Sequence, residues 1–516
     1  MAEETKKSGN LLRSSSIVAA LTMVSRVFGL VRDMIIAYFF GASAGADAFF
    51  MAFRIPNLFR RLFAEGAFAQ SFVPVLTEYR NKQPTEVVRQ LISRVSGTLG
   101  ICLLVITVLG VVSAEYIMRA FAPGFLYHAD LEKLGLAVDM LRLTFPYLFL
   151  ISMTAFAGAV LNTFGRFAVP AFTPVLLNLS LILCAIFLRP HLEQPVMALA
   201  WAVLIAGVAQ LTFQLPFLAR ANLLVAPRVD FHDPGVRRVM ALMLPAMFGA
   251  SVGQINLLLD AVLASFLETG SLSWLWYADR LFELPLALFG IAIATVLLPG
   301  LSADHANESP AAFSATLNWA IRIIVLLGIP ATVALVFLSE ALITTLFFYG
   351  EMTQRDVNMA SLALSAYGVG LFAQMLVKIL LPGYFARQDT STPVRYGVIA
   401  LVSNMVLNLI LIWHLHHVGL ALATSLSGFL NAGLLFFGLK KIGVLQLDNG
   451  WPRFLVQVLA ANLVMFVAIY LLTPDQWFGY ALLERIGLML LICSAGALIY
   501  GACLLLVGVR IRQMVR

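Results

Sequence analysis

Two arginines interrupt the first apolar segment of the chain. Arg26 and Arg32 lie six residues apart, with Ser25 and Asp33 beside them. At about 100° per residue, a helix would project both guanidinium groups to broadly one side. A guanidinium group binds phosphate through paired hydrogen bonds and keeps its charge, and burying one in a bilayer is costly enough to indicate a function. The pattern therefore predicts a water-filled site for an anionic substrate.

The second apolar segment carries a proline among charged residues. Pro56 removes a backbone donor and favours a bend, which places Asn57 and Arg60 near an opened backbone. Glu65 follows, and two interpretations of it stay open. It is either a gate of the site or a structural ion-pair partner of Arg61.

The eighth apolar segment repeats this combination of charge and proline. It contains Ser273 and Arg280 and reaches Pro285. If Arg280 faced Arg26 across a central cleft, the two would form a cationic chamber. A pyrophosphate carries enough charge for several guanidinium groups, whereas a cationic drug would be repelled.

An isolated acid in the seventh segment indicates a cation partner. Asp260, together with Asn404, Asn408 and Thr424 of later segments, offers the hard oxygen ligands that a small cation prefers. The hypothesis is a sodium site or proton coupling, with no other cofactor. The alternative is a carboxyl group that is hydrogen-bonded to neighbouring Asn or Ser side chains.

Motifs of covalent catalysis and nucleotide binding are missing from the sequence. It has no Walker-type loop, HExxH, Ser-His-Asp arrangement or phosphate-binding GxGxxG, so we expect a protein that is not an enzyme. His414, His416 and His417 are interpreted as a surface turn in preference to a metal site. The net charge of +7 is explained by cytoplasmic loops, and no nucleic acid is expected as a partner.

Composition assigns these residues to membrane helices. The chain is 61% hydrophobic and 12% charged, with a mean hydropathy of +0.91, far from the values of soluble proteins. Reading for apolar runs long enough to cross a bilayer predicts an all-α polytopic membrane protein with about fourteen spans. Their approximate extents are 14–41, 47–79, 91–121, 138–163, 168–189, 195–219, 238–267, 272–301, 314–346, 357–383, 393–414, 417–439, 453–473 and 484–508.

The basic residues predict orientation. With a cytoplasmic N-terminus, roughly twenty Lys and Arg residues fall on the cytoplasmic side and five on the other: Arg119, Lys133, Arg189, Arg355 and Arg485. Both termini are therefore predicted to be cytoplasmic. About nine basic residues remain inside spans or at their rims, among them Arg54 and Arg322, which suit snorkelling to the membrane surface.

Short sequence motifs that recur along the chain indicate a duplication. Phe164-Gly165-Arg166, followed by Thr173-Pro174 and then Asn178, resembles Phe385-Ala386-Arg387, followed by Thr392-Pro393 and then Asn404. The hypothesis is two six-helix lobes related by an axis along the membrane normal. The predicted division is residues 1–225 for the first lobe, 226–445 for the second and 446–516 for two additional helices.

The combined motifs closely resemble the MurJ (MviN) family of lipid II flippases over essentially the full length. The resemblance rests on Ser25-Arg26 with Arg32-Asp33, Asp47-Ala48-Phe49, Pro56-Asn57, Arg60-Arg61, Ala64-Glu65-Gly66 and Tyr277-Ala278-Asp279-Arg280. It implies the fourteen-helix fold of the multidrug/oligosaccharidyl-lipid/polysaccharide (MOP) exporter superfamily, similar to MATE transporters. It also implies the bacterial inner membrane, with a hydrophobic groove on the last two helices.

The resemblance implies the substrate and its contacts as well. The cargo would be lipid II, carried to the periplasmic leaflet by alternating access for peptidoglycan synthesis. The implied cavity residues are Arg26, Arg32, Arg60 and Arg280, with Ser25, Asp33, Asp47, Asn57, Glu65 and Ser273 alongside. Membrane lipids and cell-wall synthases are the other expected partners.

Three rival functions are considered. A multidrug or cation exporter of the same superfamily is disfavoured by the arginines. A flippase for another polyprenyl-pyrophosphate glycan has the same chemical requirements. A non-transporting membrane scaffold for cell-wall enzymes would tolerate loss of the buried arginines.

Overall fold

The protein is helical in every part that the structure describes. The computed structural model describes residues 2–64, 67–474 and 476–509, and these ranges contain helices and no strand. Packing divides the chain into two compact units, Met1–Leu272 (unit 1) and Ser273–Arg516 (unit 2). The predicted lobe boundary at 225/226 came from a sequence repeat, which packing does not test, and it stays a prediction.

Unit 1 contains eleven α-helices in its described residues. They are α1 (Ala2–Phe40), α2 (Ala44–Ala64), α3 (Ala67–Lys82), α4 (Thr85–Val112), α5 (Ala114–Phe121), α6 (Pro123–Tyr127), α7 (Leu131–Thr144), α8 (Tyr147–Thr163), α9 (Ala168–Leu183), α10 (Met197–Arg220) and α11 (Pro234–Ala264). The short helices η1 (Cys184–Leu188) and η2 (Arg189–His191) follow α9.

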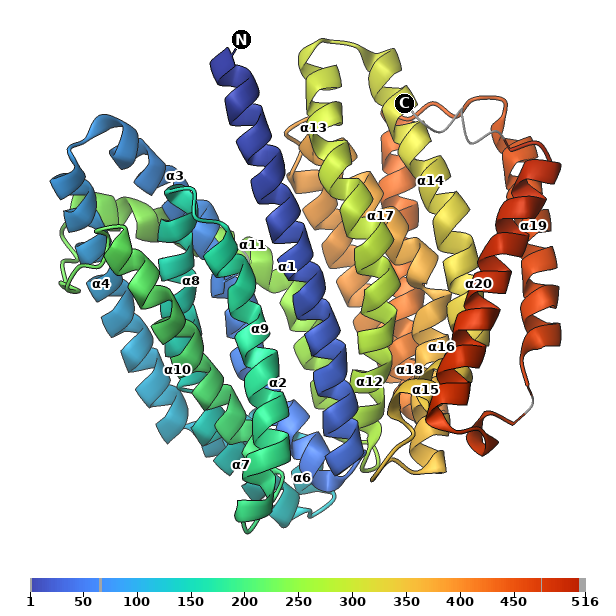
Figure 1. Cartoon of the computed structure of the whole chain (residues 1–516), viewed down its shortest axis with the longest axis horizontal. Helices are drawn as coiled ribbons and strands as arrows, with labels where there is room; N and C mark the ends of the chain where they lie inside the picture. The colour runs from blue at the N-terminus through green and yellow to red at the C-terminus, as the bar shows by residue number, and fades with distance from the viewer. Residues whose placement is uncertain (1, 65–66, 475, 510–516) are drawn as a thin grey trace. The chain divides into compact units, whose positions relative to one another are not determined.

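Small residues let the helices of unit 1 approach closely. Helix α9 packs against both α1 and α10, and α10 also packs against α8 (Figure 1). Ala198, Ala202 and Ala206 of α10 are fully buried, and a Cβ on Gly207 would lie 2.9 Å from the ring of Tyr147. Such small side chains are typical of helix contacts in membranes, where close backbone packing replaces the hydrophobic effect.

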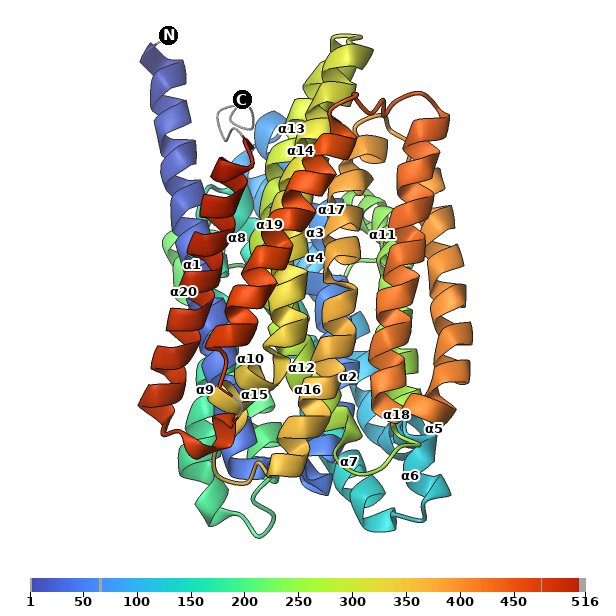
Figure 2. The same cartoon turned by 90° about the vertical axis from the view of Figure 1, so that its right-hand side faces the viewer.

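Unit 2 contains the remaining helices. They are α12 (Ser271–Pro285, which starts two residues before the unit boundary), η3 (Leu286–Ile291), α13 (Ala292–Ala306), α14 (Pro310–Phe337), α15 (Ser339–Phe347), α16 (Gln354–Val369), α17 (Leu371–Phe385), α18 (Ser391–Lys441), α19 (Trp451–Leu472), η4 (Trp477–Gly479) and α20 (Leu482–Leu506). Helix α17 packs against α14 and α18, while α19 packs against α14 and α20 (Figure 2).

The start of α18 is stabilised by a loop carboxylate. Asp389 accepts a hydrogen bond of 3.0 Å from the backbone N–H of Thr392. This bond, together with the one from the Thr392 hydroxyl, lowers the pKa of Asp389 below its ordinary value. The exposed N–H groups of the first turn thus gain an acceptor.

The predicted polytopic membrane architecture is confirmed, but the count of fourteen spans is not. Among the described residues, nine helical segments are long and apolar enough to cross a bilayer, and the bent pair α16 and α17 raises this number to ten. Part of the difference lies in α18, whose 51 residues run through a break at His416, where φ is 50°. The predicted spans 393–414 and 417–439 both lie inside this element.

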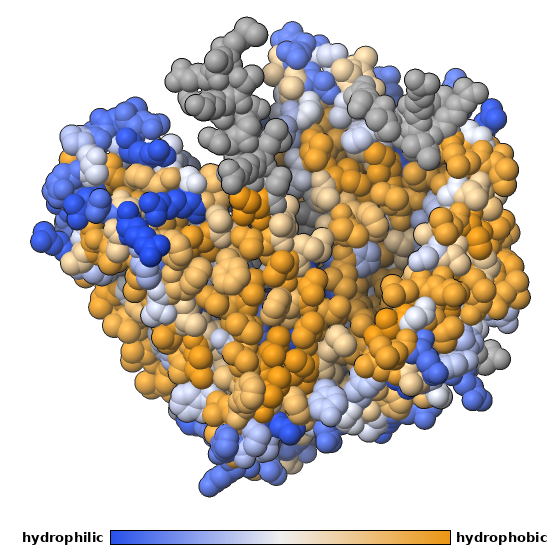
Figure 3. Space-filling model, in the orientation of Figure 1, coloured by the Kyte–Doolittle hydropathy of each residue, from blue (hydrophilic) through white to orange (hydrophobic). Residues whose placement is uncertain are grey.

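The outer faces of both units are apolar. In Figure 3 hydrophobic side chains cover α9 and α10 of unit 1 and α20 of unit 2. Phe187 of η1 and Leu498 of α20 are among the exposed large apolar side chains. Such a surface would aggregate in water and suits contact with lipid chains.

Candidate functional site

The two arginines of α1 have different environments. Arg32 is only 8% exposed and forms a bidentate ion pair with Asp33, with a shortest N–O distance of 2.7 Å. Its remaining Nη1 donates to Asn178 Oδ1 of α9 at 3.0 Å. Arg26 is partly exposed and makes no ion pair or hydrogen bond with another residue that the structure describes.

Helical geometry explains this difference. The prediction that both guanidinium groups project to broadly one side is wrong, because six residues at about 100° each place Arg26 and Arg32 about 120° apart around the axis. Arg32 therefore turns towards α9, where Asn178 also donates its amide to the carbonyl oxygen of Ser25 at 3.0 Å. The structure thus brings Ser25, Arg32 and Asp33 together around Asn178, and Arg26 keeps an available positive charge.

Helix α2 carries a second polar cluster around its internal proline. Pro56 lies inside the helix, and one turn later Arg60 Nε donates to Asn57 Oδ1 at 2.9 Å. Arg54 was predicted to snorkel to the membrane surface. In the structure its Nη1 donates to the carbonyl oxygen of Leu257 at 2.8 Å. Glu65, the predicted gate, lies outside the described residues.

Asp47, at the start of α2, is separate from these clusters. It is 1% exposed and pairs with Lys133 of α7, whose Nζ lies 3.0 Å from its Oδ2. The same oxygen accepts the backbone N–H of Gly270 at 2.8 Å. The sequence grouped Lys133 with loop charges, whereas the structure buries it.

Unit 2 contributes the cluster of α12. Arg280 pairs with Glu283 at 3.0 Å, and its guanidinium carbon lies 4.5 Å from the centre of the Trp276 ring. The Arg280 side chain remains 23% exposed, so it is accessible to a ligand. Ser273, also predicted for the site, lies about two helical turns before Arg280 and is fully buried.

Polar side chains gather inside α18 near its break. Asn408 Nδ2 donates to Asn404 Oδ1 at 2.9 Å, and Asn404 Nδ2 lies 3.4 Å from Thr424 Oγ1 and 3.3 Å from Ser427 Oγ. Three of the four predicted sodium ligands therefore lie together in unit 2. Asp260 is buried in unit 1. No group of three or more His, Cys, Asp or Glu residues suited to a metal occurs in the described ranges.

An apolar groove runs along unit 2. It has a volume of about 330 Å³. Its walls come from α14, α17, α18, α19 and the segment before α19: Ile321, Val325, Phe372, Ala373, Leu376, Phe429, Ala432, Gly433, Phe436, Leu447, Trp451 and Leu455. A groove with almost no polar atoms suits a hydrocarbon chain.

Hydrogen bonds fix one wall of the apolar groove. Trp451 Nε1 donates to Asn318 Oδ1 at 2.8 Å, and Asn318 Nδ2 donates to the Gln446 carbonyl oxygen at 2.7 Å. Arg322, predicted to snorkel, pairs with Asp448 at 2.5 Å and lies over the Trp451 ring. The segment between α18 and α19 is thereby held on α14.

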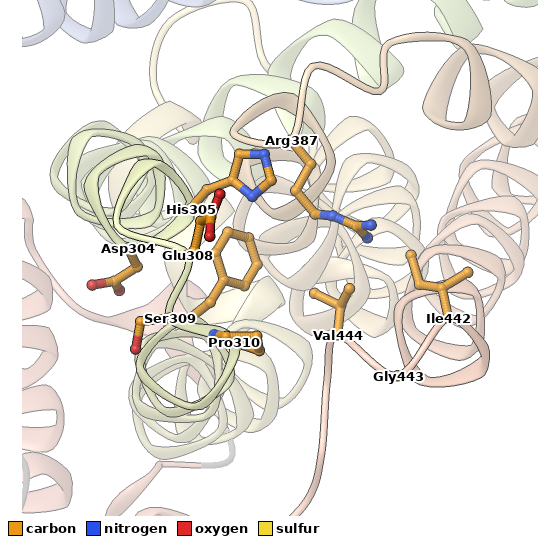
Figure 4. Close-up of a pocket in the computed structure, with 10 residues that line it drawn as sticks. Asp304, His305, Glu308, Ser309, Pro310, Arg387, Ile442, Gly443 and Val444 are labelled. Carbon is orange, nitrogen blue, oxygen red and sulfur yellow. The ribbon is translucent and has the colours of Figure 1, made fainter.

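A second, polar pocket of about 300 Å³ lies at one end of unit 2 (Figure 4). Its lining includes His305, Glu308, Phe313 and Arg387, and the Asp304 carboxylate is turned away from Arg387. It contains none of the residues predicted for the substrate site.

Sequence reasoning missed two residues of these clusters. Asn178 was noted only as part of a repeat, and Lys133 only as a loop charge, yet each binds a predicted site residue directly. Asn178 could have been identified from the sequence, because it is a polar side chain inside an apolar segment. No local signal distinguishes Lys133.

Comparisons with known proteins agree on one family. A family model described as "Lipid II flippase MurJ" matches residues 36–485. The "Probable lipid II flippase MurJ" of Vibrio cholerae serotype O1 is 48% identical over 99% of both chains. A solved structure titled "Lipid II flippase MurJ, inward closed conformation" has a TM-score of 0.79 at 29% identity, covering 94% of this chain and 97% of its own.

A more distant structure shares the fold alone. It is an inward-facing multidrug resistance transporter of the MATE family and the MOP superfamily, with a TM-score of 0.67 at 16% identity. The match covers 83% of this chain and 98% of that one.

Proposed function

The chain belongs to the MurJ family of lipid II flippases, and on this premise we propose that it carries lipid II from the cytoplasmic to the periplasmic leaflet of the bacterial inner membrane. Lipid II is undecaprenyl-pyrophosphoryl-MurNAc-pentapeptide-GlcNAc, the lipid-linked precursor of peptidoglycan. The protein moves this lipid without changing a bond in it. The match over nearly the whole chain carries the proposal.

The pyrophosphate is the group that the arginines recognise. Arg26 and Arg60 of unit 1 and Arg280 of unit 2 supply cations, and the partly exposed state of all three supports access by a ligand. Charge-assisted hydrogen bonds of guanidinium to phosphate are about twice as strong as neutral ones. Arg32 contributes less net charge because Asp33 neutralises it.

Polar neighbours orient the headgroup around these cations. Ser25 and Asn57 lie beside Arg26 and Arg60, and Ser273 precedes Arg280 on α12. Asp47 is assigned to the same site by the resemblance, but its burial with Lys133 favours a supporting role.

The polyprenyl tail stays in lipid or in the apolar groove. The groove supports this assignment because its lining is apolar and α19 forms one wall. Each methylene group that leaves water contributes about 0.8 kcal/mol, so a long isoprenoid chain needs no polar contacts.

Transport proceeds by alternating access of two six-helix lobes. The membrane potential or an inward cation resets the empty carrier, because an arginine-lined site must release its anion and return. Asp260 with Asn404, Asn408 and Thr424 is the proposed sodium site, and proton coupling is the alternative. If Asp260→Ala left transport and its sodium dependence unchanged, the coupling proposal would be wrong.

The remaining proposals concern topology and partners. The chain has fourteen transmembrane helices, with both termini in the cytoplasm, as the excess of basic residues on that side indicates. Membrane lipids surround the apolar faces, and membrane-bound cell-wall synthases are the expected protein partners.

Complementation tests the proposed function. Cells depleted of their own lipid II flippase receive the wild-type chain or the variant with both Arg26→Ala and Arg280→Ala, and growth and protein level are measured. We expect rescue by the wild type and none by the equally abundant double variant. Rescue by the double variant would favour a scaffold, while failure of abundant wild type would indicate another polyprenyl-linked glycan as cargo.

A further inference from the structure

A buried ion pair joins three parts of unit 1 at one point. Lys133 Nζ of α7 lies 3.0 Å from Asp47 Oδ2 of α2, and 3.4 Å from Thr269 Oγ1 in the segment that follows α11. Asp47 Oδ2 also accepts the backbone N–H of Gly270 at 2.8 Å. The side chains of Lys133 and Asp47 are 5% and 1% exposed, so this contact is shielded from water.

Three neighbouring groups fix the position of the Lys133 ammonium group. Its ammonium group lies 4.5 Å from the centre of the Phe125 ring, a distance suited to a cation–π interaction. Removal of one member of a buried ion pair is strongly unfavourable. Asp47 Oδ2 thus contacts both Lys133 Nζ and the Gly270 N–H, so the lysine and the residue before α12 share one carboxylate oxygen.

The Gly270 N–H that Asp47 accepts lies directly before the start of α12. Gly270 has a φ of 102°, a conformation that favours glycine, and α12 begins at the next residue, Ser271. Helix α12 carries Arg280, and the boundary between the units falls directly after Leu272. A carboxylate at this position also interacts favourably with the N-terminal end of the helix dipole.

We propose that Lys133 is a positioning residue for transport. It holds the Asp47 carboxylate on Gly270 and so fixes the point where the chain leaves unit 1 to form α12. This inference rests on the proposed flippase function, since the contact must open and close when the start of α12 moves during the cycle. Lys133 acts through Asp47 and does not touch the substrate.

A double-mutant cycle in proteoliposomes tests the proposal. The full-length chain is prepared as Lys133→Met, Asp47→Asn and the two combined, and lipid II transport turnover, lipid II binding and thermal midpoint are measured. Arg119→Met is the matched control, because Arg119 pairs with Glu115 in an exposed position. It should transport at the wild-type rate.

Each single variant should lower turnover about tenfold, while binding stays within about twofold of the wild type. In the Asp47→Asn background, Lys133→Met should add less than about twofold, because the two residues act as one unit. A Lys133→Met protein with normal turnover overturns the proposal, as do additive effects or a loss of binding equal to the loss of turnover. If the wild type itself failed to move lipid II, that result would contradict the proposed function and not the role of Lys133.

A cross-linking measurement covers the case in which these variants do not fold. His128→Cys and Phe266→Cys are combined after replacement of the four native cysteines, because the His128 ring lies 2.8 Å from the Phe266 carbonyl oxygen and both Lys133 and Asp47 are kept. A short reducible thiol cross-linker joins the two cysteines. The joined protein should stop transporting and recover after reduction, whereas Glu115→Cys with Arg119→Cys, both within α5, should transport throughout. Undiminished transport by the joined protein would contradict the proposal.

Discussion

The two arginines of α1 should respond differently to the same substitution. Arg32→Met removes the bidentate partner of the buried Asp33 carboxylate and the donor to Asn178. Removing one member of a buried pair costs about 3–5 kcal/mol of stability. Arg26→Met breaks no ion pair or hydrogen bond among the described residues, so its cost should stay below about 0.5 kcal/mol.

Substrate binding should show the opposite order. A charge-assisted hydrogen bond contributes about 1.5–3 kcal/mol, so loss of the Arg26 contact to phosphate should weaken binding about 10- to 150-fold. The assay compares thermal midpoints of the purified variants with titration of lipid II into the same samples. Arg32→Met should lower the midpoint by several degrees, and Arg26→Met should weaken binding at an unchanged midpoint.

A clear result would refute this reasoning. Equal midpoints for the two variants would mean that the Arg32–Asp33 pair does not stabilise unit 1. Normal lipid II affinity in Arg26→Met would mean that its available charge does not serve the substrate. Asn178→Leu is a useful control, because it removes one acceptor from Arg32 while the ion pair with Asp33 remains.

Three further predictions concern other parts of the chain. Gly433 lines the apolar groove and has open space at its Cβ position, so the Gly433→Phe variant should fold normally. In a liposome assay that compares the two substrates, this variant should slow transport of lipid II more than transport of a short-chain analogue. Gly97→Ala should destabilise unit 1 by about 1–3 kcal/mol, because its Cβ would lie 2.4 Å from the carbonyl carbon of Arg228; the thermal midpoint measures this. Arg485→Met should also lower the midpoint, since the buried Arg485 Nη2 donates to the carbonyl oxygen of Phe478 at 2.9 Å; an unchanged midpoint would show that this contact is dispensable.

The sequence predicts the class of molecule well, whereas the chemistry of its site stays a prediction. Apolar runs identify membrane helices because each backbone must satisfy its own hydrogen bonds in lipid. The arginines inside those runs predict an anionic substrate, since their cost in a bilayer needs a functional explanation. Family membership, predicted from the combined motifs, is confirmed.

The partners of the charged residues could not be predicted in the same way. Arg32 binds Asn178 over 146 positions of chain, and Lys133 binds Asp47 over 86 positions. Such pairings depend on how helices pack, and helix packing in lipid follows from small residues and close surface fit more than from charge patterns. The helix break at His416 was predictable, because it falls between the predicted spans 393–414 and 417–439, although neither proline nor glycine marks that position.

One measurement tests the central claim most directly. The purified chain is reconstituted into liposomes with fluorescent lipid II in one leaflet, and the headgroup that reaches the other leaflet is counted for the wild type and for the variant with both Arg26→Met and Arg280→Met. The wild type should move lipid II and the double variant should move it at least about a hundredfold more slowly, as expected for the loss of two charge-assisted contacts. Equal transport by the two proteins, at equal amounts in the membrane, would contradict a flippase whose arginines bind the pyrophosphate.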